Sequence, residues 1–187
     1  MTAAEKPLYH RVKAHPTARI SPAASLVGDV TLGRDVTVFA GAHLRGDLEP
    51  VVVGNESNLQ EGVLVHVSSG DAAIIGRHCT VGHGAIIHGC EIGDNVLVGM
   101  GAIVMSGAKI GDECVVAAGA LVPEHREFPP RSLIMGMPAR VSRTLSDEEV
   151  ALMCTEAGDE YVEVGAEMLA QGALEHPAPD MDMQVGA

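Results

Sequence analysis

The sequence is nearly devoid of aromatic residues. Aromatics make up 2% of its 187 residues, tryptophan is absent, and the four rings belong to Tyr9, Phe39, Phe128 and Tyr161. A hydrophobic core must therefore be filled by aliphatic side chains, which are plentiful in a chain that is 47% hydrophobic. This composition excludes an intrinsically disordered chain, because such chains have too few apolar residues to bury.

Positive charge is missing from the C-terminal quarter of the chain. Residues 144–187 contain 11 Asp and Glu and no Lys or Arg, whereas residues 1–143 contain all 12 Lys and Arg against 14 acidic residues. The net charge of −13 therefore belongs mostly to the tail, and the body of the protein is close to neutral. No basic stripe is present, so we expect no nucleic-acid partner.

Long hydrophobic runs are also missing. No apolar stretch approaches the roughly 18 residues that a membrane-spanning helix needs, and the N-terminus is charged where a secretory signal would be apolar. The four cysteines form no CxxC pair, which fits a reducing compartment with thiols that act as small buried hydrophobes. We therefore expect a cytoplasmic protein that makes no membrane contact.

Aliphatic residues recur at every sixth position of the chain. The four runs are Ile20, Leu26, Leu32, Val38 and Leu44; Val53, Leu59 and Val65; Ile75, Val81 and Ile87; and Ile92, Val98, Val104, Ile110, Val116 and Val122. A period of six suits short strands joined by corners, with one inward aliphatic side chain per strand and about 18 residues per triangular coil. The sequence thus predicts an all-β repeat, a parallel β-helix over residues 20–122, with an interior too narrow for rings.

The rest of the chain divides into four segments. Residues 1–19 precede the repeat, and several prolines mark residues 123–145 as an irregular crossing segment. Ser146 and Glu149 form a capping-box sequence, and the apolar residues that follow at steps of three and four predict one amphipathic α-helix over residues 146–172. Residues 173–187 contain prolines and little pattern, so we expect a flexible tail.

The six-residue period breaks at three points. Nine residues separate Leu44 from Val53 and ten separate Val65 from Ile75, whereas only five separate Ile87 from Ile92. Insertions in a solenoid form outward loops, which often lie on the binding side. The breaks therefore indicate where a functional site should be sought.

Three polar residues directly follow aliphatic positions that lie one coil apart. These residues, Arg45, His66 and His88, should stack in one column with about 4.8 Å between neighbouring coils, so that the two histidines are close enough to share a metal ion. His83 and Gln60 share a different side of the triangle. We expect a composite site, with the column from one chain and Gln60 and His83 from the next chain of a closed ring.

At these residues the sequence resembles the γ-class carbonic anhydrase family. The matching stretches are Arg45-Gly46-Asp47, Asn58-Leu59-Gln60, His66 and the run from Thr80 to Ala102. The resemblance implies a left-handed β-helix and a homotrimer in which His66, His88 and the neighbouring subunit's copy of His83 hold zinc, with iron or cobalt as alternatives. It also implies an interface salt bridge between Arg45 and Asp47, and a catalytic role for Gln60 and its motif partner Asn58 beside the metal-bound solvent.

A centre of three histidines is suited to the hydration of CO2. Three neutral imidazoles leave one coordination position open, where a bound water ionises near pH ~7. The hydroxide formed there attacks CO2 and gives bicarbonate. The function implied by the resemblance is therefore that of a metal-dependent carbonic anhydrase.

Three alternative functions stay open at this point. The C-terminal helix resembles that of the phenylacetate- and carnitine-linked hexapeptide proteins, which suggests a thioesterase acting on a CoA ester. The segment Met135–Arg140 resembles the end of the repeat in hexapeptide acyltransferases. A catalytically silent γ-carbonic-anhydrase-like protein, which binds metal as a scaffold, is the third, since a set of ligands does not prove turnover.

Overall fold

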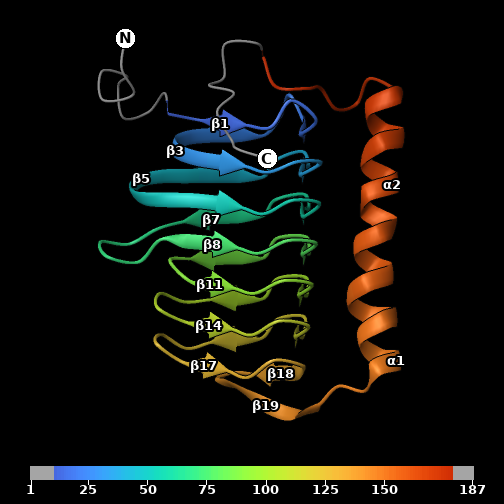
Figure 1. Ribbon diagram of the computed structural model, residues 1–187. Helices are drawn as coiled ribbons and strands as arrows, with labels where there is room; N and C mark the ends of the chain where they lie inside the picture. Colours follow the sequence, from blue (N-terminus) through green and yellow to red (C-terminus); the bar gives the residue numbers. More distant parts are fainter. Residues whose placement is uncertain (1–10, 179–187) are drawn as a thin grey trace.

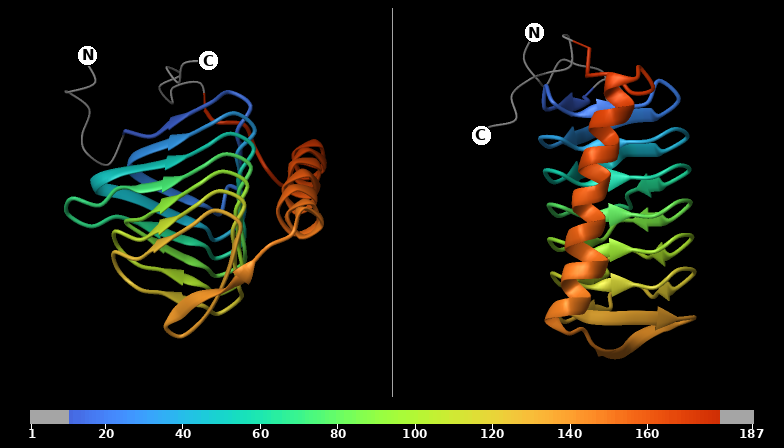
Figure 2. Two further views of the ribbon diagram at one scale, coloured as in Figure 1. Left: turned by 60° about the horizontal axis from the view of Figure 1, so that its bottom comes forward. Right: turned by 90° about the vertical axis from the view of Figure 1, so that its right-hand side faces the viewer.

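The chain winds into a three-sided solenoid flanked by one long helix (Figures 1 and 2). A computed structural model describes residues 11–178, and all strand pairs of the coil are parallel except the last. The predicted fold class, a left-handed parallel β-helix followed by a C-terminal α-helix, is confirmed. Most strands are only two or three residues long because each side of the triangle soon turns a corner.

Each face of the solenoid is a stack of parallel strands, one from each coil. The first face contains β3 (Ser25–Leu32), β5 (His43–Val53), β7 (Leu64–His66), β10 (Ile86–His88), β13 (Ile103–Val104) and β16 (Leu121–Val122). The second face contains β1 (Lys13–Ala14), the later halves of β3 and β5, β8 (Ala73–Ile75), β11 (Glu91–Ile92), β14 (Lys109–Ile110) and β17 (Glu127–Phe128). The third face contains β2 (Arg19–Ile20), β4 (Thr37–Val38), β6 (Asn58–Leu59), β9 (Thr80–Val81), β12 (Leu97–Val98), β15 (Val115–Val116) and β18 (Ser132–Gly136).

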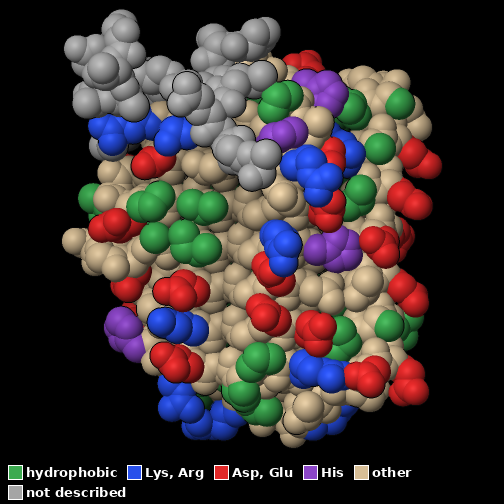
Figure 3. Space-filling model, viewed as in Figure 1, with side chains coloured by type: hydrophobic (Ala, Val, Ile, Leu, Met, Phe, Trp, Pro, Cys, Tyr) green, Lys and Arg blue, Asp and Glu red, His purple; other side chains and the backbone are tan. Residues whose placement is uncertain are grey.

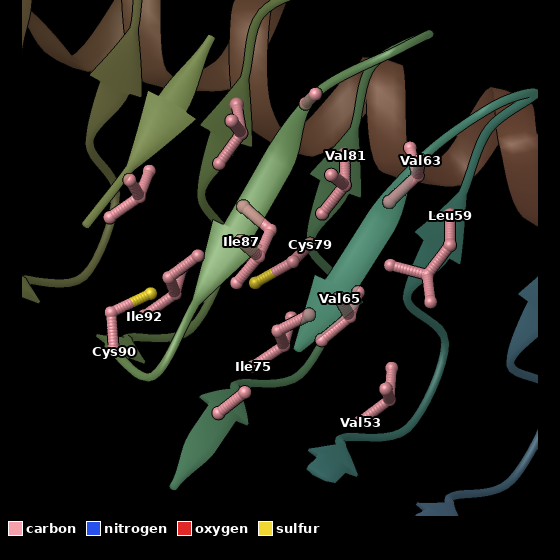
Figure 4. Close-up of a cluster of buried hydrophobic side chains, with 14 of the residues drawn as sticks. Val53, Leu59, Val63, Val65, Ile75, Cys79, Val81, Ile87, Cys90 and Ile92 are labelled. Carbon is pink, nitrogen blue, oxygen red and sulfur yellow. The ribbon is translucent and has the colours of Figure 1, made fainter. Parts of the chain in front are cut away.

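The interior is a continuous column of aliphatic side chains, as the period of six predicts. Figure 4 shows Leu59, Val65, Ile75, Val81 and Ile87 directed into the space that the three faces enclose, and each is almost completely buried. All four cysteines are free and buried. Burial raises the pKa of the Cys79 and Cys90 thiols to about 12, so these two are inert packing groups.

The coil continues beyond Val122, although the prolines of residues 123–145 predict an irregular crossing segment there. β17 pairs in parallel with β14, and β18 with β15, before β19 (Ala139–Thr144) turns back antiparallel to β18. Pro130 is tolerated at the corner between β17 and β18 because that corner's N–H is not part of the strand ladder. In an earlier coil the equivalent N–H of Arg77 donates to Asp94 Oδ1 instead, at 2.7 Å. The start of the coil also precedes residue 20, because β1 pairs with β3.

The C-terminal helix runs back along the third face, from the last coil toward the first (Figure 1). It comprises α1 (Asp147–Val150), a π-helical turn η3 (Ala151–Thr155) and α2 (Glu156–Ala170), and it begins with the expected capping box between Ser146 and Glu149. Gly158 lets the helix approach the His78 ring, which a Cβ atom would meet at 2.4 Å. Its outer side is acidic, which Figure 3 shows along the edge that the helix forms.

The chain after the helix is tied back to the first coil. Leu174 is buried, and Glu175 pairs with Ile20 through backbone hydrogen bonds of 2.8 and 2.9 Å. The expected flexible tail is therefore corrected for residues 173–178, because these bonds and the buried leucine fix them; the remainder of that prediction falls on residues 179–187, outside the described part. Within residues 11–178, neither α-helix is long and apolar enough to cross a membrane.

Candidate functional site

The strand register places Arg45, His66 and His88 in one column on the first face. Arg45 pairs with His66 between β5 and β7, and His66 pairs with His88 between β7 and β10. These are the positions that the sequence spacing predicts, because the extra residues lie outside the paired part of the column. The insertion after Leu44 lengthens β5, and the insertion after Val65 forms the loop between β7 and β8, so the column stands beside both.

The two histidines of the column lie side by side. His66 Nδ1 is 3.3 Å from His88 Nε2, and the ring centroids are 5.2 Å apart with an angle of 65° between the planes. Both residues are partly buried. His88 Nδ1 lies 2.9 Å from Ser106 Oγ, so each ring is held at one nitrogen by a neighbour other than its histidine partner.

Asp47 lies beside the ring nitrogen of His66 that does not face His88. Its Oδ1 lies 3.0 Å from His66 Nε2, and its other oxygen pairs with Arg45, which is 51% exposed. Burial raises the pKa of Asp47, but hydrogen bonds from His66 and from its own N–H, together with the charge of Arg45, outweigh that effect and lower the pKa. The Arg45–Asp47 ion pair therefore forms within one chain, and Arg45 retains an exposed side.

His83 does not join the histidine pair of its own chain. It follows β9 on the third face, is 48% exposed on its side chain, and its Nδ1 lies 2.8 Å from Glu61 Oε2. Gly84 then turns the corner at a φ of +67°, a conformation that favours glycine. Among residues 11–178 of one chain, no group of three or more His, Cys, Asp or Glu side chains is arranged to hold a metal ion.

Gln60 and Asn58 form a buried amide pair next to His83. Gln60 Nε2 donates to Asn58 Oδ1 at 3.3 Å, and Gln60 Oε1 accepts the backbone N–H of His83 at 3.2 Å. Asn58 in turn donates to Thr80 Oγ1 at 2.9 Å. Both amides are at most 3% exposed, so Gln60 acts in this chain as a brace for the backbone of His83.

An apolar groove of about 460 Å³ extends from Gln60 and His83 along the third face toward the helix. Its other walls include Leu97, Met100 and Tyr161, and Met100 is 59% exposed. The groove therefore brings the exposed His83 next to an apolar surface large enough to receive protein side chains.

Sequence reasoning missed Glu61 as a partner of the site. The two residues are 22 positions apart, which is the same one-coil offset that relates His66 to His88. The signal was therefore present in the spacing. Glu61 lies two residues after Leu59, as His83 lies two residues after Val81, so the two occupy the same corner position in successive coils.

Comparison with known proteins identifies relatives over most of the chain. A protein of Methanocaldococcus jannaschii described as "Probable carbonic anhydrase" is 54% identical over 132 residues, covering 71% of this chain and 83% of that protein. "Gamma carbonic anhydrase 1, mitochondrial" of Arabidopsis thaliana is 40% identical and covers 75% of this chain, which spans 53% of that protein's length. "Carnitine operon protein CaiE" of Escherichia coli O157:H7 is 43% identical, covering 73% of this chain and 69% of that protein.

The repeat is also recognised by family and by structure. Residues 89–124 match the family described as "Bacterial transferase hexapeptide (six repeats)". A solved structure of a hexapeptide transferase family protein from Anaplasma phagocytophilum is 31% identical, with a TM-score of 0.79 and coverage of 83% of this chain and 92% of that chain. The names of the relatives thus fall into two functional groups, carbonic anhydrases and transferases. The name of CaiE gives an operon and no activity.

Proposed function

The chain belongs to the hexapeptide-repeat family of the γ carbonic anhydrases and CaiE, and from this premise we propose that it is a metal-dependent carbonic anhydrase. The observation that carries the proposal is the contact between His66 and His88, whose facing nitrogens lie 3.3 Å apart in adjacent coils. CO2 is the proposed substrate and bicarbonate the product. We propose that the protein acts in the cytoplasm.

The histidines fit a metal centre only when two chains meet. His66 and His88 supply two imidazoles from the first face, and His83 presents a third, exposed imidazole on another face of the same chain. Imidazole is a good ligand for zinc, iron and cobalt, and zinc is the metal we propose, with Fe²⁺ or Co²⁺ as alternatives. We therefore propose a homotrimer in which His83 reaches the His66–His88 pair of a neighbour.

Glu61 supports this arrangement on the donor side. With Glu61 accepting a hydrogen bond from Nδ1–H, His83 keeps its Nε2 lone pair free on a side chain that is 48% exposed. When bound, the metal would supply Lewis-acid activation of a water molecule for attack on CO2. The apolar groove beside His83 is the surface on which the neighbouring chain would pack.

The remaining site residues have positioning and binding roles in this proposal. Gln60, supported by Asn58, fixes the backbone of His83 and so positions the imidazole that the neighbouring chain would receive. Asp47 orients His66, and the exposed side of Arg45 offers a guanidinium that can hold the bicarbonate anion. All of these residues lie on the first or the third face, next to the histidines.

A second candidate function is supported by the relatives that carry other names. CaiE and the hexapeptide transferase family protein match this chain at 43% and 31% identity. A thioesterase acting on a CoA ester, or an acyltransferase, would use one of the histidines as a general base and need no metal. A catalytically silent protein with the same histidines is the remaining alternative.

The deciding experiment is a CO2-hydration assay on metal-replete protein, prepared anaerobically with iron and separately with zinc. We expect a rate above buffer that disappears in His66→Ala. Thiol release from a panel of acyl-CoA esters, measured on the same preparations, tests the second function. A protein with bound metal but no hydration rate in either form would overturn the proposed activity, and thiol release lost in His66→Ala would then support the thioesterase.

A further inference from the structure

A chain of hydrogen-bonding side chains extends from His88 to a carboxylate on the neighbouring loop. Ser106 Oγ lies 2.9 Å from His88 Nδ1, Ser68 Oγ lies 3.2 Å from Ser106 Oγ, and Asp71 Oδ2 lies 3.1 Å from Ser68 Oγ. Ser68 and Asp71 lie in the loop between β7 and β8, Ser106 lies in the corner between β13 and β14, and the proposed hydration of CO2 gives these three residues no role. Ser106 is only 9% exposed, so its hydroxyl is largely restricted to these partners.

The loop that follows β7 fixes the outer end of this chain. Ser68 and Asp71 exchange two backbone hydrogen bonds, of 3.2 and 3.0 Å, and close a tight turn with Gly70 at a φ of +88°. Glu49 also accepts the N–H of Gly70 at 3.2 Å. The loop is therefore ordered by its own backbone, and it holds the Asp71 carboxylate next to Ser68 in a fixed position.

The carboxylate sets the direction of every hydrogen bond in the chain. An ionised carboxylate only accepts, so the single hydroxyl proton of Ser68 is donated to Asp71. Ser68 Oγ then accepts from Ser106, whose own oxygen is left to accept from His88 Nδ1–H. With its proton on Nδ1, His88 presents an unprotonated Nε2 on the side that faces His66.

We propose that Ser106, supported by Ser68 and Asp71, is a positioning residue that holds His88 in the tautomer and ring orientation needed to ligate a metal. The inference rests on the proposed metal site and adds to it the group that orients the ligand. Outer partners of this kind hold metal-ligating histidines in known sites, and their loss lowers metal affinity about 10- to 100-fold. The usual partner is one carboxylate or carbonyl, whereas here two hydroxyls connect the histidine to a carboxylate.

The test is the affinity for Zn²⁺, measured on the assembled protein by competition with a chelator. We expect Ser106→Ala to bind zinc about 10- to 100-fold more weakly than the wild type, and Ser106→Thr, which keeps the hydroxyl, to restore most of the affinity. Asp71→Ala should weaken binding by a smaller factor, because the Ser106 hydroxyl stays beside His88 Nδ1 and only the carboxylate that sets its direction is lost. Ser69→Ala is the matched control, since Ser69 is exposed in the same loop, and it should bind zinc as the wild type does.

A second measurement separates positioning from general destabilisation. In zinc-loaded wild-type protein, ¹H–¹⁵N spectra should show a protected Nδ1–H proton on His88, and this signal should be lost in Ser106→Ala while the melting temperature changes little. Equal zinc affinity in the wild type and Ser106→Ala would overturn the inference and leave the metal site intact. A wild-type protein that takes up no zinc, iron or cobalt would instead remove the proposed function, and this role with it.

Discussion

His66 Nδ1 and His88 Nε2 lie 3.3 Å apart, although 22 residues of chain separate the two histidines. One coil of the solenoid accounts for that separation, so the contact is a direct product of the strand register between β7 and β10. His83 is only five residues before His88 and yet lies on a different face. Proximity in the sequence and proximity in the site are therefore unrelated here.

Mixing two inactive variants should restore activity if the site is shared between chains. His66→Ala and His83→Ala should each lose CO2 hydration and zinc binding as pure proteins. After co-refolding in equal amounts, random assembly leaves about one quarter of the interfaces with both intact partners, so about one quarter of the wild-type rate should return. The measurement is the hydration rate against the mixing ratio, and a mixture of His66→Ala with His88→Ala, which removes two ligands of the same chain face, is the control that should stay inactive.

Glu61→Ala should weaken metal binding without unfolding the protein. The carboxylate of Glu61 is half-exposed and accepts from His83 Nδ1, so its loss removes an orienting partner and disturbs no core residue. We expect about a 10-fold or greater loss of zinc affinity and an unchanged melting temperature. Isothermal titration checks the first and thermal denaturation the second; full affinity in this variant would show that His83 is oriented by the neighbouring chain alone.

Ile87→Ala should destabilise the coil far more than Ile86→Ala. Ile87 is completely buried in the aliphatic column, whereas Ile86 is directed outward and only partly buried. Truncation of a buried isoleucine costs about 2–5 kcal/mol, because the packed column cannot collapse around the cavity. Urea denaturation of the two variants measures the difference, and equal losses would contradict the packing of Ile87 in the buried column.

The start of the C-terminal helix should weaken in acid. Hydrogen bonds from Arg143 and from the Ser146 N–H lower the pKa of Glu149 to about 2. Because the folded pKa lies below the ordinary value, the stabilisation is complete above the unfolded pKa of about 4.5 and is lost as the pH falls toward 2. Melting temperatures measured between about pH 6 and pH 2 should therefore differ between the wild type and Glu149→Gln at the upper end and converge at the lower end.

The matched control for this titration is Glu163→Gln. Glu163 is exposed on the same helix, outside the capping box, and its replacement should change the melting temperature at about pH 6 much less than that of Glu149. A Glu149→Gln variant that melts like the wild type across the whole range would contradict a role for the capping box in docking the helix.

The column of Arg45, His66 and His88 was predictable because counting alone determines it. Once the extra residues at each break are left out of the count, the residues after Leu44, Val65 and Ile87 must stack. The continuation of the coil past Val122 was not predictable, because prolines usually mark the end of a run of regular strands. Whether an N–H belongs to the ladder at a given corner depends on side-chain partners such as Asp94, which the pattern of aliphatic residues does not show.

The role of Gln60 was equally hidden from the sequence. Its motif suggested a side chain free to meet solvent, whereas both ends of the amide are used by Asn58 and by the backbone of His83. Such bonds depend on which rotamers the corner permits, and one sequence does not specify them. The identities of the site residues were therefore easier to predict than their partners.

The long helix joins the last coil to the first, since Glu175 pairs with Ile20 beyond its C-terminal end. A solenoid whose coils touch only their neighbours can unzip from either end, one repeat at a time. Here one helix packs across the third face from β2 to β15, so an end coil cannot separate without also breaking contacts of the helix. We expect this chain to unfold in a single cooperative step, more like a globular domain than like a repeat array.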